Sequence, residues 1–168
     1  MTTLALTLKG LVNGSFTNAL DIETGISSIN NSQSYTIADG TGANQANAVW
    51  SDTRTLSASA SEEHDLAGGL TDIYGTTRTF TIIKAIFVSA AAANTNNVLV
   101  GGSASNAFVN WVESATDIVT VHPGGMMMVV APDATGFAVT ASTGDLLKVA
   151  NSSSGTGVTY DIIIVGVA

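Results

Sequence analysis

Phe80-Thr81-Ile82-Ile83-Lys84-Ala85-Ile86-Phe87-Val88 is the stretch of sequence that decides the fold class. β-Branched and aromatic side chains predominate in it, as they do in β-strands. Apart from Thr81 and Lys84, both faces of such a strand would be apolar, which is typical of a strand that is covered on both sides. We therefore predict a central strand over residues 80–88.

Similar short runs follow this strand, and clusters of Gly, Pro, Asn, Asp and Ser separate them. Strands of about four to ten residues with turns every eight to twelve residues are typical of a β-sandwich or barrel. The sequence therefore predicts an all-β fold, with about nine strands in a jelly-roll-like β-sandwich whose pairing order stays open. The later runs cover residues 97–100, 107–112, 117–121, 126–131, 137–141, 145–150 and 158–167.

A further strand is predicted before the central one, over residues 53–61. Thr or Ser occupies every second position there, and Arg54 and Leu56 lie among the alternate residues. Such alternation is typical of a strand with one face in water and the other in the core.

The N-terminal part of the chain has a different composition. From Gly10 to Asn47 it is rich in Asn, Ser, Thr and Gly, and it contains turn-forming pairs such as Asn13-Gly14 and Asn30-Asn31. A polar segment of this kind gains little by packing on itself, so it is either mobile or ordered along another subunit. We expect residues 1–47 to form an N-terminal arm or loop-rich segment, and residues 48–168 to form the β-sandwich domain.

The overall composition restricts the partners of the chain. Its 168 residues suit one domain, and with 5 Lys plus Arg against 13 Asp plus Glu the net charge is −8, so we expect no nucleic-acid partner. The absence of Cys excludes disulfides, a thiol nucleophile and thiolate metal sites. A mean hydropathy of +0.36 with only 11% charged residues predicts that neighbouring subunits cover some apolar surface.

Nothing in the sequence predicts export or membrane insertion. Residues 1–10 lack the basic region and continuous apolar core of a signal peptide, so we expect a protein that is not secreted. The longest apolar runs, 126–131 and 162–167, are far shorter than the roughly 20 residues of a membrane-spanning helix.

Two histidines are the candidates for acid–base chemistry. His64 stands beside Glu62, Glu63 and Asp65, and His122 begins a Pro-Gly-Gly turn. Neither has a Gly-x-Ser-x-Gly nucleophile motif nearby, so we expect no catalytic residue and no enzyme activity. Because three acids neighbour His64, we expect its protonated form to be favoured.

Carboxylates near turns are the remaining candidates for a site. Asp133, Asp145 and Asp161 all lie beside turn formers, and the 6% aromatic content is low for the sugar platforms of a glycosidase. A calcium site around Asp133 or Asp145 stays open, although no calcium-binding motif supports it. We therefore expect neither a cofactor nor a bound metal.

Three residues are predicted to contact partners. Trp50 stands at the junction of the N-terminal segment and the sandwich, where an amphipathic ring suits an interface. Arg54 belongs to the predicted strand 53–61, and Met127 belongs to a run of three Met that would contact other subunits if one face is exposed. Trp111, within a predicted strand, is expected in the core.

Several stretches, over about two thirds of the chain, resemble small virion structural proteins of tailed bacteriophages. They are rich in Ala, Gly, Ser and Thr, and the last is an apolar terminal strand; they comprise residues 57–70, 84–88, 122–125, 132–137, 143–149 and 160–166. The resemblance implies a capsid decoration (cement) protein with a jelly-roll-like domain, located in the virion after assembly in the host cytoplasm. It also implies a symmetric oligomer, for which we expect a homotrimer, and the major capsid protein as partner. It identifies no functional residues.

Two other functions stay open at this point. A phage tail or fibre component acting as a receptor-binding module would have an exposed loop cluster at one end of the sandwich. The sequence lacks the heptads of a coiled-coil stalk. A polysaccharide depolymerase would need two converging carboxylates in a cleft, which the low content of charged and aromatic residues disfavours.

Overall fold

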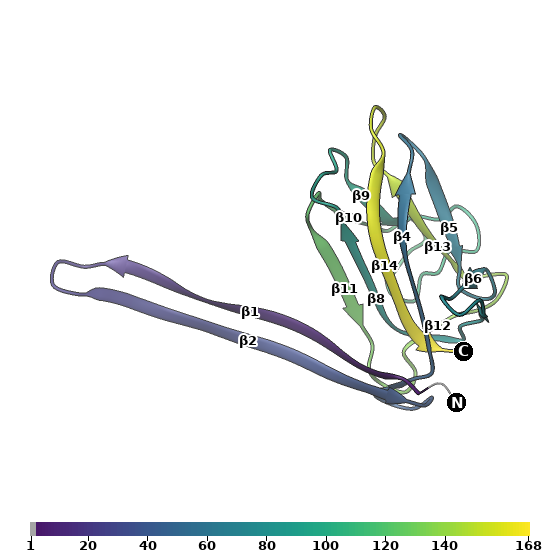
Figure 1. Ribbon diagram of the computed structural model, residues 1–168, viewed down its shortest axis with the longest axis horizontal. Coiled ribbons are helices and arrows are strands. Elements are labelled where there is room, and N and C mark those ends of the chain that lie inside the picture. Colours follow the sequence, from purple (N-terminus) through teal and green to yellow (C-terminus); the bar gives the residue numbers. More distant parts are fainter. Residues whose placement is uncertain (1–2) are drawn as a thin grey trace.

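The computed structural model describes residues 3–168, and these residues form strands and loops without a helix (Figure 1). The all-β prediction is confirmed. The fourteen strands are β1 (Ala5–Ala19), β2 (Thr24–Asp39), β3 (Gln45–Ala46), β4 (Ala48–Leu56), β5 (Ser61–Asp65), β6 (Leu70–Thr71), β7 (Thr77–Arg78), β8 (Ile82–Ala90), β9 (Val98–Gly101), β10 (Ile118–Val121), β11 (Met126–Val130), β12 (Phe137–Ala138), β13 (Leu146–Asn151) and β14 (Val158–Val167).

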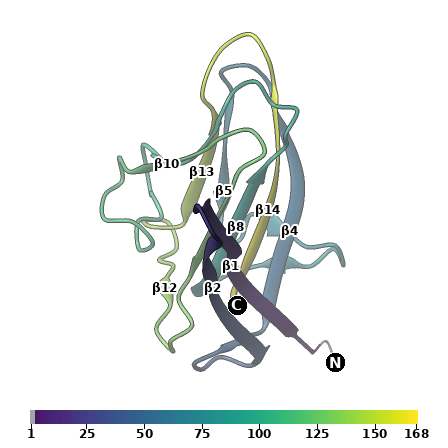
Figure 2. The ribbon, with the colours of Figure 1, turned by 90° about the vertical axis from the view of Figure 1, so that its left-hand side faces the viewer.

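Two antiparallel sheets form the body of the molecule as two facing layers (Figure 2). One has the strand order β11-β8-β14-β4, with β12 also paired to β8, and the other has the order β10-β9-β13-β5. The main core lies between them, where Ile86 and Ile162 of the first sheet meet Val100 and Val149 of the second. These side chains are fully buried, so the contact between the sheets provides most of the hydrophobic stabilisation.

The predicted central strand is confirmed as β8, which pairs with β11 on one side and β14 on the other. Its first residues differ from the prediction, since the strand begins at Ile82 rather than Phe80. Lys84 is fully buried in it, and its ammonium group donates hydrogen bonds to the carbonyl oxygens of Asp133 and Ala134. A buried cation needs such acceptors, which explains how this strand tolerates a charged residue.

Two predicted strands are wrong, and a third, over residues 137–141, is reduced to Phe137–Ala138. Residues 53–61 do not form one strand, because β4 ends at Leu56 and Ser59 has a positive φ of 58° in the turn before β5. The Ser and Ala alternation continues through that turn, so the pattern concealed the break. Residues 107–112 form a turn in which the Val112 amide donates to the Val109 carbonyl, and Ala107 alone makes a bridge, to Leu146.

The N-terminal segment is a long regular hairpin rather than an irregular, loop-rich chain. All 15 residues of β1 pair with β2, from Ala5 opposite Ala38 to Ala19 opposite Thr24. Asn13 and Asn30, which the sequence suggested as turn residues, lie opposite each other in the middle of the strands. The turn is at the tip, where the Leu20 amide donates to the Glu23 carbonyl at 2.8 Å. Residues 1 and 2 of the expected 1–47 segment lie outside the described residues.

Only the base of this hairpin packs on the sandwich. Ile37, Leu6 and Leu8 lie with Ala85 and Val165 in a second apolar cluster on the outer face of the β11-β8-β14-β4 sheet. The rest of the hairpin projects from the body, as Figure 1 shows. The fold therefore joins a sandwich to an arm that is anchored at one end.

Candidate functional site

The projecting part of the hairpin is the most unusual surface of the molecule. Nearly every residue from Lys9 to Ser34 is exposed, including several large apolar side chains. An isolated two-stranded ribbon is marginally stable in water, and exposed apolar groups in such a ribbon favour contact with another surface. The exposed apolar residues are Leu11, Val12, Phe16, Leu20, Ile22, Ile26 and Ile29.

The apolar residues of the hairpin are concentrated on one face. Side chains alternate between the two faces of a strand, and directly paired residues share a face. Leu6 and Leu8, which pack on the sandwich, therefore share a face with Val12 and Phe16 on β1, and with Ile29, which pairs with Gly14. We call Val12, Phe16 and Ile29 the arm face. The face that binds the sandwich at the base thus continues along the exposed part of the hairpin.

The hairpin also has few features that would prevent another strand from pairing with it or an apolar surface from docking on it. Residues 10–20 and 24–38 contain neither a charged residue nor Pro, and the acids of this region, Asp21 and Glu23, lie at the tip. Beyond its base, β1 pairs only with β2, so both outer edges of the projecting ribbon are free in the described structure. Charges and Pro are the usual means of protecting free edges.

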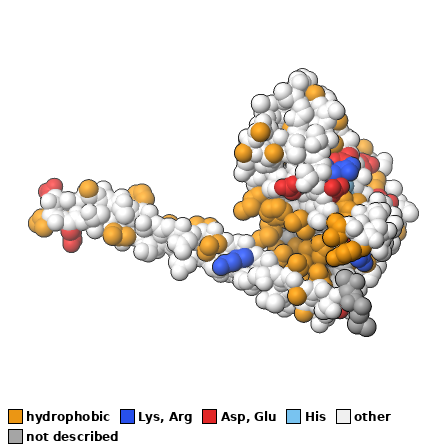
Figure 3. Space-filling view, viewed as in Figure 1, with side chains coloured by type: hydrophobic (Ala, Val, Ile, Leu, Met, Phe, Trp, Pro, Cys, Tyr) orange, Lys and Arg blue, Asp and Glu red, His pale blue; other side chains and the backbone are white. Residues whose placement is uncertain are grey.

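A second exposed apolar surface lies on the sandwich beside the base of the hairpin. Phe87 pairs with Met128 on one side and with Ile163 on the other, so the three side chains share the outer face of the sheet. Met126 lies two residues before Met128 on the same face and is 72% exposed. We call Phe87, Met126, Met128 and Ile163 the outer strip. Figure 3 shows apolar side chains gathered on the body where the hairpin leaves it.

The outer strip and the hairpin base enclose a shallow hollow. Leu8 and Lys9 line it on the hairpin side, and Phe87, Met128 and Ile163 line it on the sheet side. The apolar contact between the hairpin base and the sheet is therefore continuous with a larger apolar surface.

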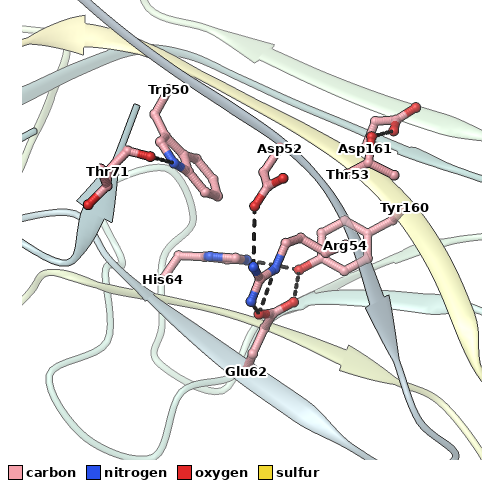
Figure 4. Close-up of polar contacts among 9 residues, drawn as sticks. All are labelled: Trp50, Asp52, Thr53, Arg54, Glu62, His64, Thr71, Tyr160 and Asp161. Carbon is pink, nitrogen blue, oxygen red and sulfur yellow. Dashed lines mark hydrogen bonds and ion pairs between the residues drawn. The ribbon is translucent and has the colours of Figure 1, made fainter. Parts of the chain in front are cut away.

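A polar cluster connects the two sheets along one side of the sandwich (Figure 4). The Arg54 guanidinium on β4 donates to Glu62 on β5, with Nη2 at 2.5 Å from Oε2. The Tyr160 hydroxyl on β14 donates to the other oxygen of Glu62 at 2.5 Å and lies 2.9 Å from His64 Nε2. Because the hydroxyl proton goes to Glu62, His64 Nε2 is the donor to Tyr160.

The expectation that the protonated form of His64 is favoured is wrong. Burial lowers the pKa of His64, and this effect exceeds the attraction of Glu62 for the charged form. The positive charge of Arg54 lowers the pKa of His64 further, while Asp52 raises it by a smaller effect. The carboxylates of Glu63 and Asp65 bind other partners, Ser103 and the Ala67 amide. Burial raises the pKa of Glu62, but the hydrogen bonds from Arg54 and Tyr160 outweigh it and leave that pKa lowered.

The three predicted contact residues lie in different environments. Trp50 is 5% exposed, its ring centre lies 5.2 Å from that of His64 at a tilt of 51°, and its indole N–H donates to the Thr71 carbonyl. Arg54 is bound within the polar cluster, and Met127 packs against the core. None of the three belongs to the arm face or the outer strip. Trp111 packs partly buried against the core.

The candidate calcium residues serve as turn residues. Asp133 Oδ1 accepts the amide protons of Thr135 and Gly136, and Asp145 Oδ2 accepts that of Ser142. Residues 3–168 bring together no group of three His, Asp or Glu side chains that could hold a metal ion.

Comparison with protein-family models, with curated proteins and with solved structures finds no match for the chain. Within residues 3–168, no helix has the length and apolar character needed to cross a membrane.

Sequence reasoning missed the arm face and found only the methionines of the outer strip. The alternation of Leu4, Leu6 and Leu8 was a signal for a strand at the N-terminus, and β-branched Ile26, Ile29 and Ile37 recur in the partner strand. For the outer strip the signal was the run of three Met, in which Met126 and Met128 rather than Met127 lie on the outer face. Phe87 and Ile163 had no such signal, because the sheet brings them to the strip from two other strands.

Proposed function

We propose that the chain is a non-enzymatic virion structural protein that decorates a phage capsid and stabilises it by bridging major capsid subunits. The observation that carries this proposal is the projecting hairpin, whose exposed apolar face needs a partner surface. A protein that binds only the assembled shell shifts the assembly equilibrium toward that shell. A rigid body with a long arm suits this task, because the arm can reach beyond the surface on which the body sits.

The sandwich supports a jelly-roll architecture for this body. The two sheets together contain eight strands in two layers, with the strand orders β4-β14-β8-β11 and β5-β13-β9-β10. Each inter-strand pair in these two sheets is antiparallel, and consecutive strands such as β4 and β5, or β8 and β9, fall in opposite sheets. The resemblance to small virion proteins implies the same architecture.

The length of the arm also supports a bridging role. From Lys9 to Ala19 the strand extends about 35 Å, at roughly 3.3 Å per residue. A body of about 120 residues has a radius of gyration of about 14 Å, so the arm is as long as the body is wide. An arm of this length reaches across a neighbouring subunit.

The proposal is tested by binding to heads of the phage that encodes the chain, prepared without this protein. Co-sedimentation should recover the full chain with heads, at a fixed number of copies per capsid, and the heads should then resist a higher temperature before they open. Tail fractions and host cells are the matched alternatives. Binding to tails or host cells but not to heads would replace this proposal by the receptor-binding function.

A variant with a shortened hairpin tests whether the protection of the heads depends on the arm. Residues 10–33 are replaced by a two-residue turn, which keeps the packed pairs Leu6–Ile37 and Leu8–Tyr35. We expect this variant to remain folded and to give the heads less protection than the full chain. Equal protection by the two proteins would contradict the role of the hairpin.

A further inference from the structure

We infer that the arm face of one chain docks on the outer strip of a second copy of this chain, so that the copies form a closed ring. This inference deepens the proposed function, because it rests on the hairpin as the assembling element and names the surface that the hairpin binds. Its test uses no capsid, so it can fail while the capsid proposal stands.

The first argument is continuity with a contact that already exists within the chain. At the base, Leu6 and Leu8 of the hairpin pack on Ala85 and Val165 of the sheet. On the hairpin, the same ribbon face continues as the arm face, and on the sheet the same outer face continues as the outer strip. The arm face thus extends the hairpin surface that already packs on the sheet, and the outer strip extends the sheet surface that already packs on the hairpin.

The second argument is that one chain cannot satisfy both surfaces. The hairpin leaves the sheet near Lys9 and projects away from the body, so the arm face and outer strip of one chain do not meet (Figure 1). Every copy therefore offers one donor surface and one acceptor surface. A head-to-tail contact of this type closes into a ring when the rotation between copies allows it.

The third argument concerns charge. Arm-face residues lie in a stretch without charged side chains, and the outer strip consists of Phe, Met and Ile. Neither the arm face nor the outer strip itself contains a charged group, so the charged groups near the contact lie at its margin, where Lys9 lines the hollow and Asp161 lies beside Phe87 and Ile163. The acids at the tip, Asp21 and Glu23, lie beyond the arm face, where they can remain in water.

The test is the solution mass of the full-length protein by light scattering over a range of micromolar concentrations. We expect an oligomer, with three copies of 17.0 kDa giving about 51 kDa. Phe16→Ser should weaken association by roughly tenfold or more per interface, since it removes a large apolar side chain from each contact. A wild-type chain that stays monomeric at these concentrations would overturn the inference.

Leu11→Ser is the matched control. Leu11 and Val12 are neighbours with similar exposure, 55% and 64%, but they point to opposite faces of the ribbon. Val12→Ser should therefore weaken the oligomer, whereas Leu11→Ser should leave its mass unchanged. Equal effects of these two substitutions would show that the arm face has no special role.

Mixing two defective chains tests the donor–acceptor relation directly. Phe16→Ser retains an intact outer strip, and Ile163→Glu retains an intact arm face. At a concentration where each variant alone is monomeric, their mixture should give a 1:1 complex through the one intact contact. Two monomers that do not combine would refute the inference, provided that both melt as wild type does. Met126→Glu, at a 72% exposed position, replaces Ile163→Glu if the latter lowers the melting temperature.

Discussion

Replacing Tyr160 by Phe tests whether the polar cluster holds the two sheets together. Tyr160 is 1% exposed, and its hydroxyl accepts from His64 and donates to Glu62. The substitution leaves the buried His64 N–H without an acceptor, which costs about 1 to 3 kcal/mol. Glu62 keeps its bonds to Arg54 and is partly exposed, so water replaces much of the lost bond there. We therefore expect the free energy of unfolding to fall by about 2 to 3 kcal/mol.

Urea unfolding at pH 7.5 measures this change, with the protomer concentration held constant because association contributes to apparent stability. For a domain of this size the expected loss lowers the melting temperature by about 5 to 10 °C. Tyr74→Phe is the matched control: this residue is 75% exposed, and we expect a change within about 0.5 kcal/mol. A Tyr160→Phe variant as stable as that control would refute the inter-sheet role of the hydroxyl.

A double-mutant cycle separates the hydrogen bond from the packing of the ring. In His64→Leu the donor to Tyr160 is absent, so Tyr160→Phe should cost at least about 1 kcal/mol less in that background than in the wild type. The two losses should simply add if the side chains do not interact, and additivity would contradict the 2.9 Å contact between His64 and Tyr160.

Three further predictions concern other buried groups. Because burial lowers the pKa of His64 in the folded state, the unfolded chain binds the proton more tightly. The free energy of unfolding should therefore fall as the pH drops below about 6.5, by at most about 1.4 kcal/mol per pH unit. In thermal melts at pH 5.5 to 7.5, His64→Gln should remove this dependence, whereas His122→Gln, at an exposed position, should not. Lys84→Ala should lower the free energy of urea unfolding by about 3 kcal/mol, because it removes the donor to two turn carbonyls and leaves a cavity; an unchanged midpoint would contradict this role. Gly166→Ala should cost about 2 kcal/mol in the same assay, since its Cβ would clash with the Ile82 carbonyl oxygen at the bulge of β14, and a neutral result would mean that the bulge adapts freely.

Local sequence patterns predicted the body of the fold well. Residues 80–88 and 158–167 are long, rich in β-branched side chains and bounded by turn formers, and they became the paired strands β8 and β14. Their apolar composition matches the buried environment at the centre of the sheet, so these strands can be recognised from the local sequence. Residues 53–61 failed because small residues such as Ser57 and Ala60 fit a turn as well as a strand.

The hairpin was harder to predict because its stability does not come from local composition. Asn13, Gly14 and Asn30 favour turns in isolation, but the registration of 15 residues of β1 against β2 overrides that preference. The packing of Leu6 and Leu8 on the sheet fixes the register at the base, where a slip of one residue would turn both side chains to the solvent. That contact joins residues far apart in the sequence, and a local pattern does not contain it.

The composition and the structure together explain how the hairpin carries exposed apolar side chains. A mean hydropathy of +0.36 with 11% charged residues would be unfavourable if the exposed apolar groups formed one broad patch. Instead, Ser, Thr or Asn flanks Phe16 and Ile29 on both sides and Val12 on one side along a narrow ribbon, so hydrated groups separate these apolar side chains. In the proposed docking, a complementary strip must align with several of these positions at once. Alignment over several positions, rather than the hydrophobicity of any one, then determines which surface the arm selects.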